Sequence, residues 1–433
     1  MSRVFPGRVR AHCLPVGALL LAACASTPRA SEHGLHRDET PQLAALPGYR
    51  GIADCTGATP ADTPCREMQA PTLGDAERAL GARPAAAWGR GGRWTVAYRA
   101  ADDAVTGVDV MGGVQLPLSR IPGSRVWALA LRLPGLDSAV ISLALDVRGG
   151  AGGSVYDTTS LRVWRGPSAP PPPRERARVA GSVREDSLWS DALRAWRRVT
   201  VYLPPGVRSD GGPGRTPVVY VADGQNVRDY ARVVDPLVAA GALPPVALVG
   251  VWVSSGTPGG GPPTGPATDL RTIEYHPEVE RLPGADSAFV AARYRGHYRF
   301  FTDEVPRWAE ATLGVSAERR WRAVQGNSSG ASYALRLGRE LPERYGLVIA
   351  NSNGARSDLA GPAGGWGVAP WHYLSVGVLE PALARTLRAM GDSLARHGVR
   401  HAVTVYPSGH DAVVWRESLP RALAWWLAPS GTP

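Results

Sequence analysis

Short apolar runs alternate with amphipathic segments over the second half of the chain. From about residue 181 onward, runs in which nearly every position is apolar, such as residues 218–222, are separated by longer segments. These longer segments occupy residues 228–240, 291–313 and 381–397, and their apolar positions recur with the helical period of about 3.6 residues. Buried strands that alternate with helices are typical of a doubly wound, mostly parallel sheet. The pattern therefore predicts an α/β domain over residues 181–428.

Residues 85–166 carry a different pattern, in which apolar and polar positions alternate with a period of two. The alternation is clearest at residues 94–98, 126–131 and 140–147, and Gly, Pro and Asp residues separate these runs. Alternation bounded by turn residues is the pattern of strands with one buried face. We predict a small all-β sandwich here, followed by a stiff proline-rich linker over residues 167–180.

The N-terminus has the pattern of an export signal. Three arginines lie within the first ten residues, and a short apolar run follows over residues 14–23. This run is too short to cross a bilayer as a helix but has the length of the apolar core of a signal peptide. The sequence Leu21-Ala22-Ala23-Cys24 resembles a bacterial lipobox, in which the peptidase cuts before a cysteine that is then lipidated.

We therefore predict a signal peptide over residues 1–23 and a lipid anchor on Cys24. An ordinary signal peptide that is cut at a nearby small-residue site is the alternative. Because alanine rather than aspartate follows Cys24, the resemblance to bacterial lipoproteins implies an outer-membrane protein that faces the periplasm. A periplasmic or secreted protein is the alternative location. Several acyl chains give stable anchoring, whereas a single chain binds a membrane only marginally.

Two further cysteines lie between the predicted signal peptide and the β domain. Cys55 and Cys65 are ten residues apart in a stretch rich in Gly, Thr, Pro and Ala. An even pair of cysteines in an exported protein predicts a disulfide. Their spacing is not that of a C-x-x-C redox motif, and no sequence pattern typical of a metal site occurs. We predict that residues 24–84 form a tether and a loop closed by this disulfide.

The strongly basic composition does not indicate a nucleic-acid partner. All 48 basic residues are arginine, and the net charge is +10. The arginines are scattered among acids rather than gathered in a basic block with aromatic residues between them. Together with the abundant Ala, Gly and Pro, this composition is typical of a GC-rich genome. We expect no nucleic-acid partner.

The candidate chemistry centres on residues 326–330, whose sequence GNSSG fits the G-x-S-x-G pattern. A strand-like run precedes the pattern at residues 321–325, and a helical segment follows at residues 331–343. In this context the pattern marks a sharp strand-to-helix turn that exposes the serine hydroxyl. We predict Ser328 as the nucleophile and the backbone N–H of Ser329 as an oxyanion donor. An ordinary Gly/Ser turn is the alternative.

An acid and a base follow in the order that this chemistry requires. Glu380 comes at the end of the apolar run 373–378, and His410 lies in a Gly-His-Asp loop after another strand-like run. The order serine, acid, histidine is that of α/β-hydrolases rather than of chymotrypsin or subtilisin. We predict that His410 is the general base and that Glu380 orients its imidazole. Asp411 and Asp358 are the competing acids, and the alternative for Glu380 is simply to begin a helix, where a carboxylate is favoured.

Several sequence blocks of the second half occur in a recognisable order. They are an opening strand at residues 197–206, an Asp-Gly loop at 218–226, an Arg-x-x-Glu-Tyr segment at 271–275, a helix at 300–306, the serine motif, Gly-Val-Leu-Glu-Pro at 377–381, and Gly-His-Asp at 409–411 with Trp415. In this order they resemble the putative esterase family, which includes enterochelin esterases and esterase D. The resemblance covers about residue 181 to the end. It implies a serine hydrolase of the α/β-hydrolase fold, which needs no cofactor.

The resemblance also adds candidate binding residues. In the family a second oxyanion donor comes from the Asp-Gly loop, which implies the backbone N–H of Gly224 or Gln225, although Asp-Gly is also an ordinary turn signal. Arg271 and Glu274 follow a Gly/Pro-rich loop, and Arg271 is a candidate for binding a carboxylate or catecholate substrate. Pairing with a nearby acid is the alternative. Residues 118–133 resemble the immunoglobulin-like N-terminal domain of enterochelin esterases, which implies that type for the β domain.

These expectations combine into an exported, lipid-anchored serine esterase whose partner is a small-molecule or glycan ester. The resemblance implies a siderophore-type or other catecholate ester as the substrate. A feruloyl or acetyl ester on a polysaccharide, or acyl transfer on the same fold, are alternatives, because function resides in the site rather than in the fold. A non-catalytic binding lipoprotein on a hydrolase scaffold is a further alternative.

Overall fold

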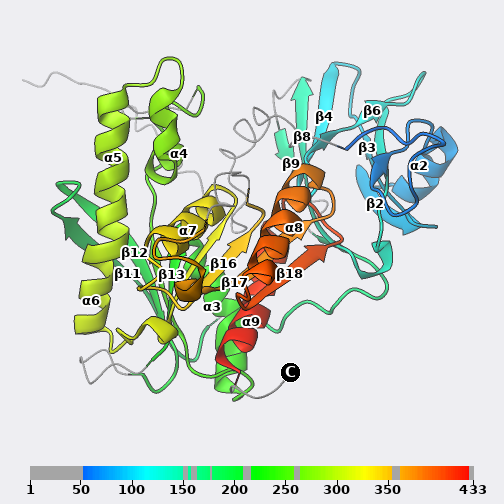
Figure 1. Ribbon diagram of the computed structural model, residues 1–433. Coiled ribbons are helices and arrows are strands. Elements are labelled where there is room, and N and C mark those ends of the chain that lie inside the picture. Colours follow the sequence, from blue (N-terminus) through cyan, green and yellow to red (C-terminus); the bar gives the residue numbers. More distant parts are fainter. Residues whose placement is uncertain are drawn as a thin grey trace, which may run out of the picture. The chain divides into compact units, whose positions relative to one another are not determined.

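The computed structural model describes residues 52–149, 155–157, 163–175, 178–207, 216–257, 264–353 and 361–428. The predicted signal peptide, Cys24 and the competing acid Asp358 lie outside the described residues. Figure 1 shows a β-rich region that ends at residue 165 and an α/β region that begins at residue 182. No helix in the described ranges combines the length and the apolar character that a membrane span requires.

One eight-stranded sheet forms the centre of the α/β region. In spatial order its strands are β11 (Ser182–Ser190), β12 (Ala195–Leu203), β14 (Ala247–Val251), β13 (Val218–Ala222), β15 (Arg322–Asn327), β16 (Leu347–Asn351), β17 (Trp371–Gly377) and β18 (His401–Tyr406). Neighbours from β14 to β18 pair in parallel, whereas β11–β12 and β12–β14 pair antiparallel. The sheet is therefore only partly parallel, so the predicted mostly parallel sheet is confirmed for β14 to β18 and not for the β11–β12 and β12–β14 pairings. The connection from β11 to β12 is too short for a parallel crossover, so these strands must run in opposite directions.

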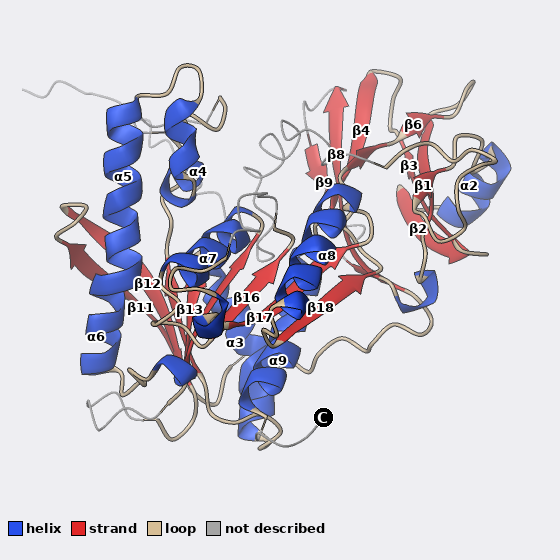
Figure 2. Cartoon of the chain, viewed as in Figure 1, coloured by secondary structure: helices blue, strands red, loops and turns tan. Residues whose placement is uncertain are grey.

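Helices cover both faces of this sheet (Figure 2). Side chains of β13 alternate between two cores, because Val218 and Tyr220 pack in one cluster while Val219 and Val221 pack in the other. The first core includes residues of α6 (Val305–Thr312), α7 (Ser329–Glu340) and α8 (Pro381–Arg396), and the second includes residues of α3 (Val227–Ala239) and α9 (Ala412–Leu427). Strands that are apolar at nearly every position are thus buried on both faces.

The helix predicted over residues 291–313 consists of two helices. The first, α5 (Ser287–Arg299), continues through a π-helical turn, Phe300–Glu304, into α6. Pro306 accounts for the turn, because proline lacks an N–H and its ring collides with the carbonyl group four residues earlier in a regular α-helix. Shorter helices are α4 (Leu270–Tyr275) and the 3-10 turns Leu136–Ser138, Gly224–Asn226, Pro277–Arg281, Arg319–Trp321 and Trp366–Val368.

The β-rich region, called the β region below, contains two five-stranded sheets with one shared core. One sheet consists of β1 (Cys65–Arg66), β2 (Ala85–Arg90), β3 (Arg93–Arg99), β6 (Ser119–Arg120) and β7 (Val126–Arg132), and the other of β4 (Val105–Gly112), β5 (Leu116–Pro117), β8 (Val140–Gly149), β9 (Val155–Asp157) and β10 (Val163–Arg165). Trp94 and Leu131 of the first sheet share a buried cluster with Val110 and Ile141 of the second. Helix α2 (Leu73–Leu80) and β1 lie within the segment predicted as tether and loop. An immunoglobulin-like type for this region stays a prediction.

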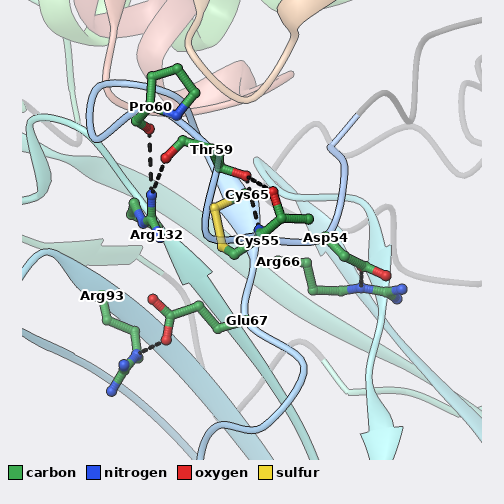
Figure 3. The surroundings of a disulfide bond; sticks show 10 residues. Asp54, Cys55, Thr59, Pro60, Cys65, Arg66, Glu67, Arg93 and Arg132 are labelled. Atoms are coloured by element: carbon green, nitrogen blue, oxygen red, sulfur yellow. Dashed lines mark hydrogen bonds and ion pairs between the residues drawn. A yellow bond between two sulfur atoms is a disulfide. The ribbon is translucent and has the colours of Figure 1, made fainter.

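A disulfide joins Cys55 and Cys65 and fastens the chain segment that enters the β region (Figure 3). Cys65 is fully buried, and the N–H of Cys55 donates to the carbonyl oxygen of Arg66 at 2.8 Å. On the other side of this loop, the guanidinium of Arg132 donates to the carbonyl oxygen of Thr59 at 3.2 Å. Since Arg132 belongs to β7, the loop is tied to the first sheet by covalent and polar contacts together.

Candidate active site

The G-x-S-x-G motif forms a sharp turn between β15 and α7. Ser328 has a backbone φ of 55° and ψ of −124°, a conformation that residues other than glycine rarely adopt. Strain at a serine between a strand and a helix is the geometry of a nucleophile elbow. Gly326 leaves necessary space, because a Cβ there would collide with the carbonyl oxygen of Gly330. The N–H of Ser328 donates to the carbonyl oxygen of Asn351 at 2.9 Å, which ties the turn to the end of β16.

A buried polar layer lies directly before this turn. Oδ1 of Asn327 accepts hydrogen bonds of 2.8 Å from Nε2 of Gln325 and from Nδ2 of Asn351, and Nδ2 of Asn327 donates to the hydroxyl of Tyr230 at 2.6 Å. Oδ1 of Asn351 accepts from the hydroxyl of Ser375 at 2.5 Å. These bonds join the ends of β15, β16 and β17, and a hydrogen-bonded network in the interior fixes geometry more strictly than apolar packing does. Sequence reasoning missed this layer, because isolated Asn, Gln and Ser residues in strands have no distinctive spacing.

His410 and Glu380 form a buried hydrogen-bonded pair. Nδ1 of His410 donates to Oε1 of Glu380 at 2.7 Å, and the two residues are 5% and 2% exposed. An ionised carboxylate only accepts, so this bond assigns the proton of the neutral imidazole to Nδ1 and leaves Nε2 as the basic nitrogen. Oε2 of Glu380 also accepts from the N–H of Gly377 at 2.8 Å. The acid predicted from sequence is therefore in contact with the predicted base.

Two further side chains support this pair. The hydroxyl of Ser352 donates to Oε2 of Glu380 at 2.8 Å and accepts a bond of 3.0 Å from Nε1 of Trp415. The indole of Trp415 also meets the imidazole of His410 edge to face, with ring centroids 4.6 Å apart. Trp415 belongs to a sequence block already noted, whereas Ser352 gave no sequence signal beyond its place at the end of an apolar run.

The structure brings the predicted serine, acid and base to one edge of the sheet. β15, β17 and β18 run in the same direction, and Ser328, Glu380 and His410 each follow the carboxyl end of one of them. The histidine loop, defined here as residues 407–411, lies against the end of β17, since a Cβ on Gly377 would be 2.5 Å from the carbonyl oxygen of Gly409. The three residues thus lie in loops that follow the carboxyl ends of β15, β17 and β18, and β16 separates β15 from β17 in the sheet.

The loop with the second predicted oxyanion donor adjoins the serine turn. Gly224 and Gln225 begin a 3-10 turn after β13, which is the neighbour of β15 in the sheet. A Cβ on Gly330 would lie 3.0 Å from Oδ2 of Asp223, so this loop touches the first turn of α7. Ser329 is the first residue of α7, where backbone N–H groups have no partner within the helix. Both candidate donors therefore come from backbone at the same edge.

Arg271, a predicted substrate-binding residue, is paired with an acid. Its Nε and Nη2 donate to the two carboxylate oxygens of Asp223 at 2.8 and 2.9 Å, a bidentate arrangement in a largely buried position. The N–H of Asp223 donates to the hydroxyl of Tyr275 at 2.8 Å, and Asp223 has a left-handed φ of 58°. Arg271 and Tyr275 therefore hold the strained residue that precedes Gly224.

Glu274, the other predicted substrate-binding residue, has no exposed surface. Its carboxylate accepts bonds of 2.7 and 2.9 Å from Arg197 and a bond of 2.8 Å from Nε of Arg293. Burial acts to raise the pKa of Glu274, but the neighbouring His297 and the two arginines outweigh it and hold this pKa well below its usual range. This finding corrects the substrate-binding prediction for Glu274, because a carboxylate enclosed by protein cations cannot reach a substrate.

Asp411, one of the competing acids, accepts hydrogen bonds from backbone N–H groups. Its Oδ2 accepts from the N–H of Ser142 in β8 at 2.7 Å, and its Oδ1 accepts from the N–H of Val413 at 2.9 Å. Burial raises the pKa of Asp411, and these donors only partly offset that effect. Among the described side chains, no three His, Cys, Asp or Glu residues come close enough together to hold a metal ion.

Comparison with known proteins identifies the family. The family model described as putative esterase matches residues 190–426, more than half of the chain. This chain belongs to the putative esterase family. The esterase shares its fold with the ferric enterobactin esterase of Salmonella typhimurium, with 16% identity and a TM-score of 0.54 over 79% of this chain and 96% of that one. Comparison with curated proteins finds no relative.

A second enterobactin esterase, from Shigella flexneri and solved in the presence of enterobactin, shares the fold as well. It has 17% identity and a TM-score of 0.53, and the match covers 79% of this chain and 95% of that one. Such low identity shows the fold alone. Because 79% of the esterase is more than residues 190–426, the shared fold extends into the residues before the family match.

Proposed function

We propose that this esterase hydrolyses carboxylic esters by nucleophilic catalysis, with Ser328 as the nucleophile, His410 as the general base and Glu380 as the orienting acid. The observation that carries the proposal is the buried 2.7 Å bond from His410 to Glu380, at the same edge of the sheet as the strained Ser328. A serine in an elbow, a neutral imidazole and a carboxylate that fixes its tautomer are the three parts that acyl transfer by serine requires.

The first half of the reaction forms an acyl-enzyme. Nε2 of His410 takes the proton of the Ser328 hydroxyl while Oγ attacks the carbonyl carbon of the ester. The tetrahedral oxyanion is stabilised by the N–H of Ser329 and by the N–H of Gly224 or Gln225. Collapse of this intermediate breaks the bond to the alcohol oxygen, and the alcohol leaves with the proton from Nε2.

The second half releases the acid. Nε2 of His410 takes a proton from water, and the resulting hydroxide attacks the acyl carbon of the Ser328 ester. The oxyanion donors act again, and Ser328 leaves with the proton from Nε2. Glu380 stays ionised throughout and stabilises the imidazolium that forms twice in each cycle.

For the substrate we propose a siderophore-type or related catecholate ester. The support is the shared fold with two enterobactin esterases, one of them solved in the presence of enterobactin, over a span that includes part of the β region. A feruloyl or acetyl ester of a polysaccharide, and acyl transfer in place of hydrolysis, are the other outcomes of the test below.

We further propose that the esterase is an exported lipoprotein, anchored through Cys24 at the outer membrane and facing the periplasm. The support is the sequence of the first 24 residues together with the Cys55–Cys65 disulfide, a bond that persists in oxidising compartments. An anchor on that face of the membrane would keep the active site in the periplasm.

A fluorophosphonate probe tests the nucleophile. Full-length protein in detergent is expected to carry a single adduct on the peptide that contains Ser328. Ser328→Ala should abolish the adduct, and His410→Ala should slow labelling by about 1,000-fold or more. Ser329→Ala is the matched control, since only its backbone N–H has a role. Absence of label, with no turnover of any ester, would favour a non-catalytic binding protein.

A substrate panel tests the ester class. The panel compares enterobactin, methyl ferulate and acetylated xylan at equal concentration, with product analysis in the presence of a sugar acceptor. Preference for enterobactin in kcat/KM supports the proposal. Preference for methyl ferulate or acetylated xylan would replace the proposed substrate class with a polysaccharide ester. Transfer of the acyl group to the sugar would replace hydrolysis with acyl transfer.

A further inference from the structure

The histidine loop is buried against the β region. Asp411, which follows His410 and precedes α9, accepts the 2.7 Å bond from the N–H of Ser142 in the interior of β8, and both residues are buried. The same oxygen, Oδ2, accepts a bond of 3.1 Å from the hydroxyl of Ser408, and Oδ1 accepts from the N–H of Val413 at 2.9 Å. One carboxylate thus connects a strand of the β region, the histidine loop and the first turn of α9.

Two glycines let the backbones of the two regions meet. Gly113 follows β4, and its N–H donates to the carbonyl oxygen of Ser142 at 3.1 Å. A Cβ on Gly113 would collide with Oδ2 of Asp411, and a Cβ on Gly409 would collide with the carbonyl oxygen of Gly113. Neither glycine has a left-handed φ. Space, rather than backbone conformation, therefore demands glycine at both positions.

The loop that carries the acid is fastened to the same region. Leu379, the residue before Glu380, is 5% exposed and belongs to the hydrophobic cluster of the β region, which also contains Leu131 and Ile141. Its N–H donates to the carbonyl oxygen of Ser408 at 2.9 Å. Burial of this apolar side chain favours the contact between the acid loop and the β region. The β region thus contacts the acid loop and the histidine loop together.

Such contacts matter because proton transfer depends on position. A displacement of about 1 Å in a catalytic group lowers a rate by about 100-fold. The ring of His410 is held by Glu380 and Trp415, but the backbone of residues 407–411 has no helix or strand to define it. The buried bond to Ser142 and the close approach of Gly113 supply fixed reference points for that backbone.

We propose that the β region is part of the catalytic apparatus, because the bond from Ser142 to Asp411, in the space left by Gly113, positions His410 for proton transfer. Asp411 is then a positioning residue, and the β region acts on the proton-transfer step through it. The inference rests on the proposed function, since it takes His410 as the base.

The test uses Gly113→Ala, a change in the β region that adds one methyl group against Asp411. In the full-length enzyme we expect kcat to fall by about 10- to 100-fold while KM stays within about twofold. Asp411→Ala should give a similar loss. In the Asp411→Ala background the added methyl group meets no carboxylate, so Gly113→Ala should cost nothing further, and the double-mutant cycle should be non-additive. Gly57→Ala is the matched control, because a Cβ there has no neighbour within 4 Å.

Circular dichroism and thermal unfolding accompany each variant. If Gly113→Ala fails to fold, Asp411→Asn replaces it, since the amide keeps the size of the side chain and loses one acceptor; a loss in kcat at constant KM supports the proposal there too. An unchanged kcat, or a rise in KM alone, would overturn the inference and leave the proposed function standing. Absence of ester turnover by the unaltered enzyme would overturn both.

Discussion

The hydroxyl of Ser352 donates a 2.8 Å hydrogen bond to Oε2 of Glu380, the carboxylate oxygen that does not face His410. Ser352 reaches this position with a left-handed φ of 54°, and it also accepts the indole N–H of Trp415. The indole ring meets the imidazole from a second direction. Glu380 and Trp415 therefore both contact the candidate base His410, and Ser352 links the two by hydrogen bonds.

Removal of the Ser352 hydroxyl should loosen these contacts. In Ser352→Ala, Glu380 loses one hydrogen-bond donor and the indole N–H of Trp415 loses its acceptor, so we expect a fall in kcat of about tenfold with little change in KM. Trp415→Phe should act in the same direction. Steady-state kinetics with a soluble aryl ester measure both variants. The control is Ser418→Ala, because the hydroxyl of Ser418 donates to the backbone carbonyl oxygen of Trp415 and not to Glu380. An equal loss of kcat in this variant would contradict a specific role for the Ser352 hydroxyl.

The sequence left two roles open for Arg271, namely substrate binding and pairing with a nearby acid, and variants of Arg271 can distinguish them. Because its guanidinium holds Asp223 before the Gly224 loop, Arg271→Met should lower kcat by about tenfold for neutral and anionic esters alike. Arg271→Lys should recover part of the loss, since an ammonium group retains the charge but not the bidentate bond. A direct role in substrate binding predicts something else, namely a rise in KM confined to anionic esters. Kinetics with a matched neutral and carboxylated ester pair distinguish the two.

Lipidation of Cys24 is open to a direct test. In a bacterial host that processes lipoproteins, the full-length protein should incorporate a labelled fatty acid and sediment with membranes. Cys24→Ser should remove the label, while esterase activity per molecule stays the same, because the anchor lies far in sequence from Ser328. Incorporation of label by Cys24→Ser would show that another residue carries the lipid.

The sequence could predict those parts of the site that lie in local patterns. The turn around Ser328 needs small neighbours and a strand-to-helix change, and both are visible as glycines and as a change in apolar period. Glu380 and His410 were found because each follows an apolar run, and parallel strands bring their carboxyl ends to one edge. The same reasoning could not give the direction of β11 and β12, since an apolar pattern carries no information on strand direction.

Other parts of the site depend on contacts between distant segments. The bond from Ser142 to Asp411 joins residues 269 positions apart, and a backbone N–H leaves no trace in the sequence. For Glu274 the sequence suggested a role that the structure does not support. Its position in a motif indicated substrate binding, but its carboxylate pairs with Arg197 of β12 and Arg293 of α5, which are distant in sequence. Whether a charged side chain faces a substrate or another residue is decided by tertiary packing.

Acid should weaken the fold through a buried histidine. His372 in β17 is 9% exposed, and burial lowers its pKa from 6.5 to about 4. Between these two values the unfolded chain binds a proton that the folded chain does not, so the free energy of unfolding should fall as the pH falls through this window. For one histidine the slope approaches about 1.4 kcal/mol per pH unit. Burial likewise lowers the pKa of His297 to about 4, although the nearby Glu274 acts to raise it. His297 should therefore add a second loss of unfolding free energy as the pH falls.

Urea unfolding of the full-length enzyme at pH 7.0, 6.0 and 5.0 measures this dependence. His372→Leu replaces the imidazole by an apolar group of similar size, so it should remove one histidine's share of the slope and leave the share of His297. The variant should therefore lose less stability than the unaltered enzyme between pH 6.0 and pH 5.0, whatever its stability at pH 7.0. Equal slopes in the two proteins would mean that His372 binds its proton as readily in the folded state as in the unfolded one, and that burial at this position does not exclude the charge.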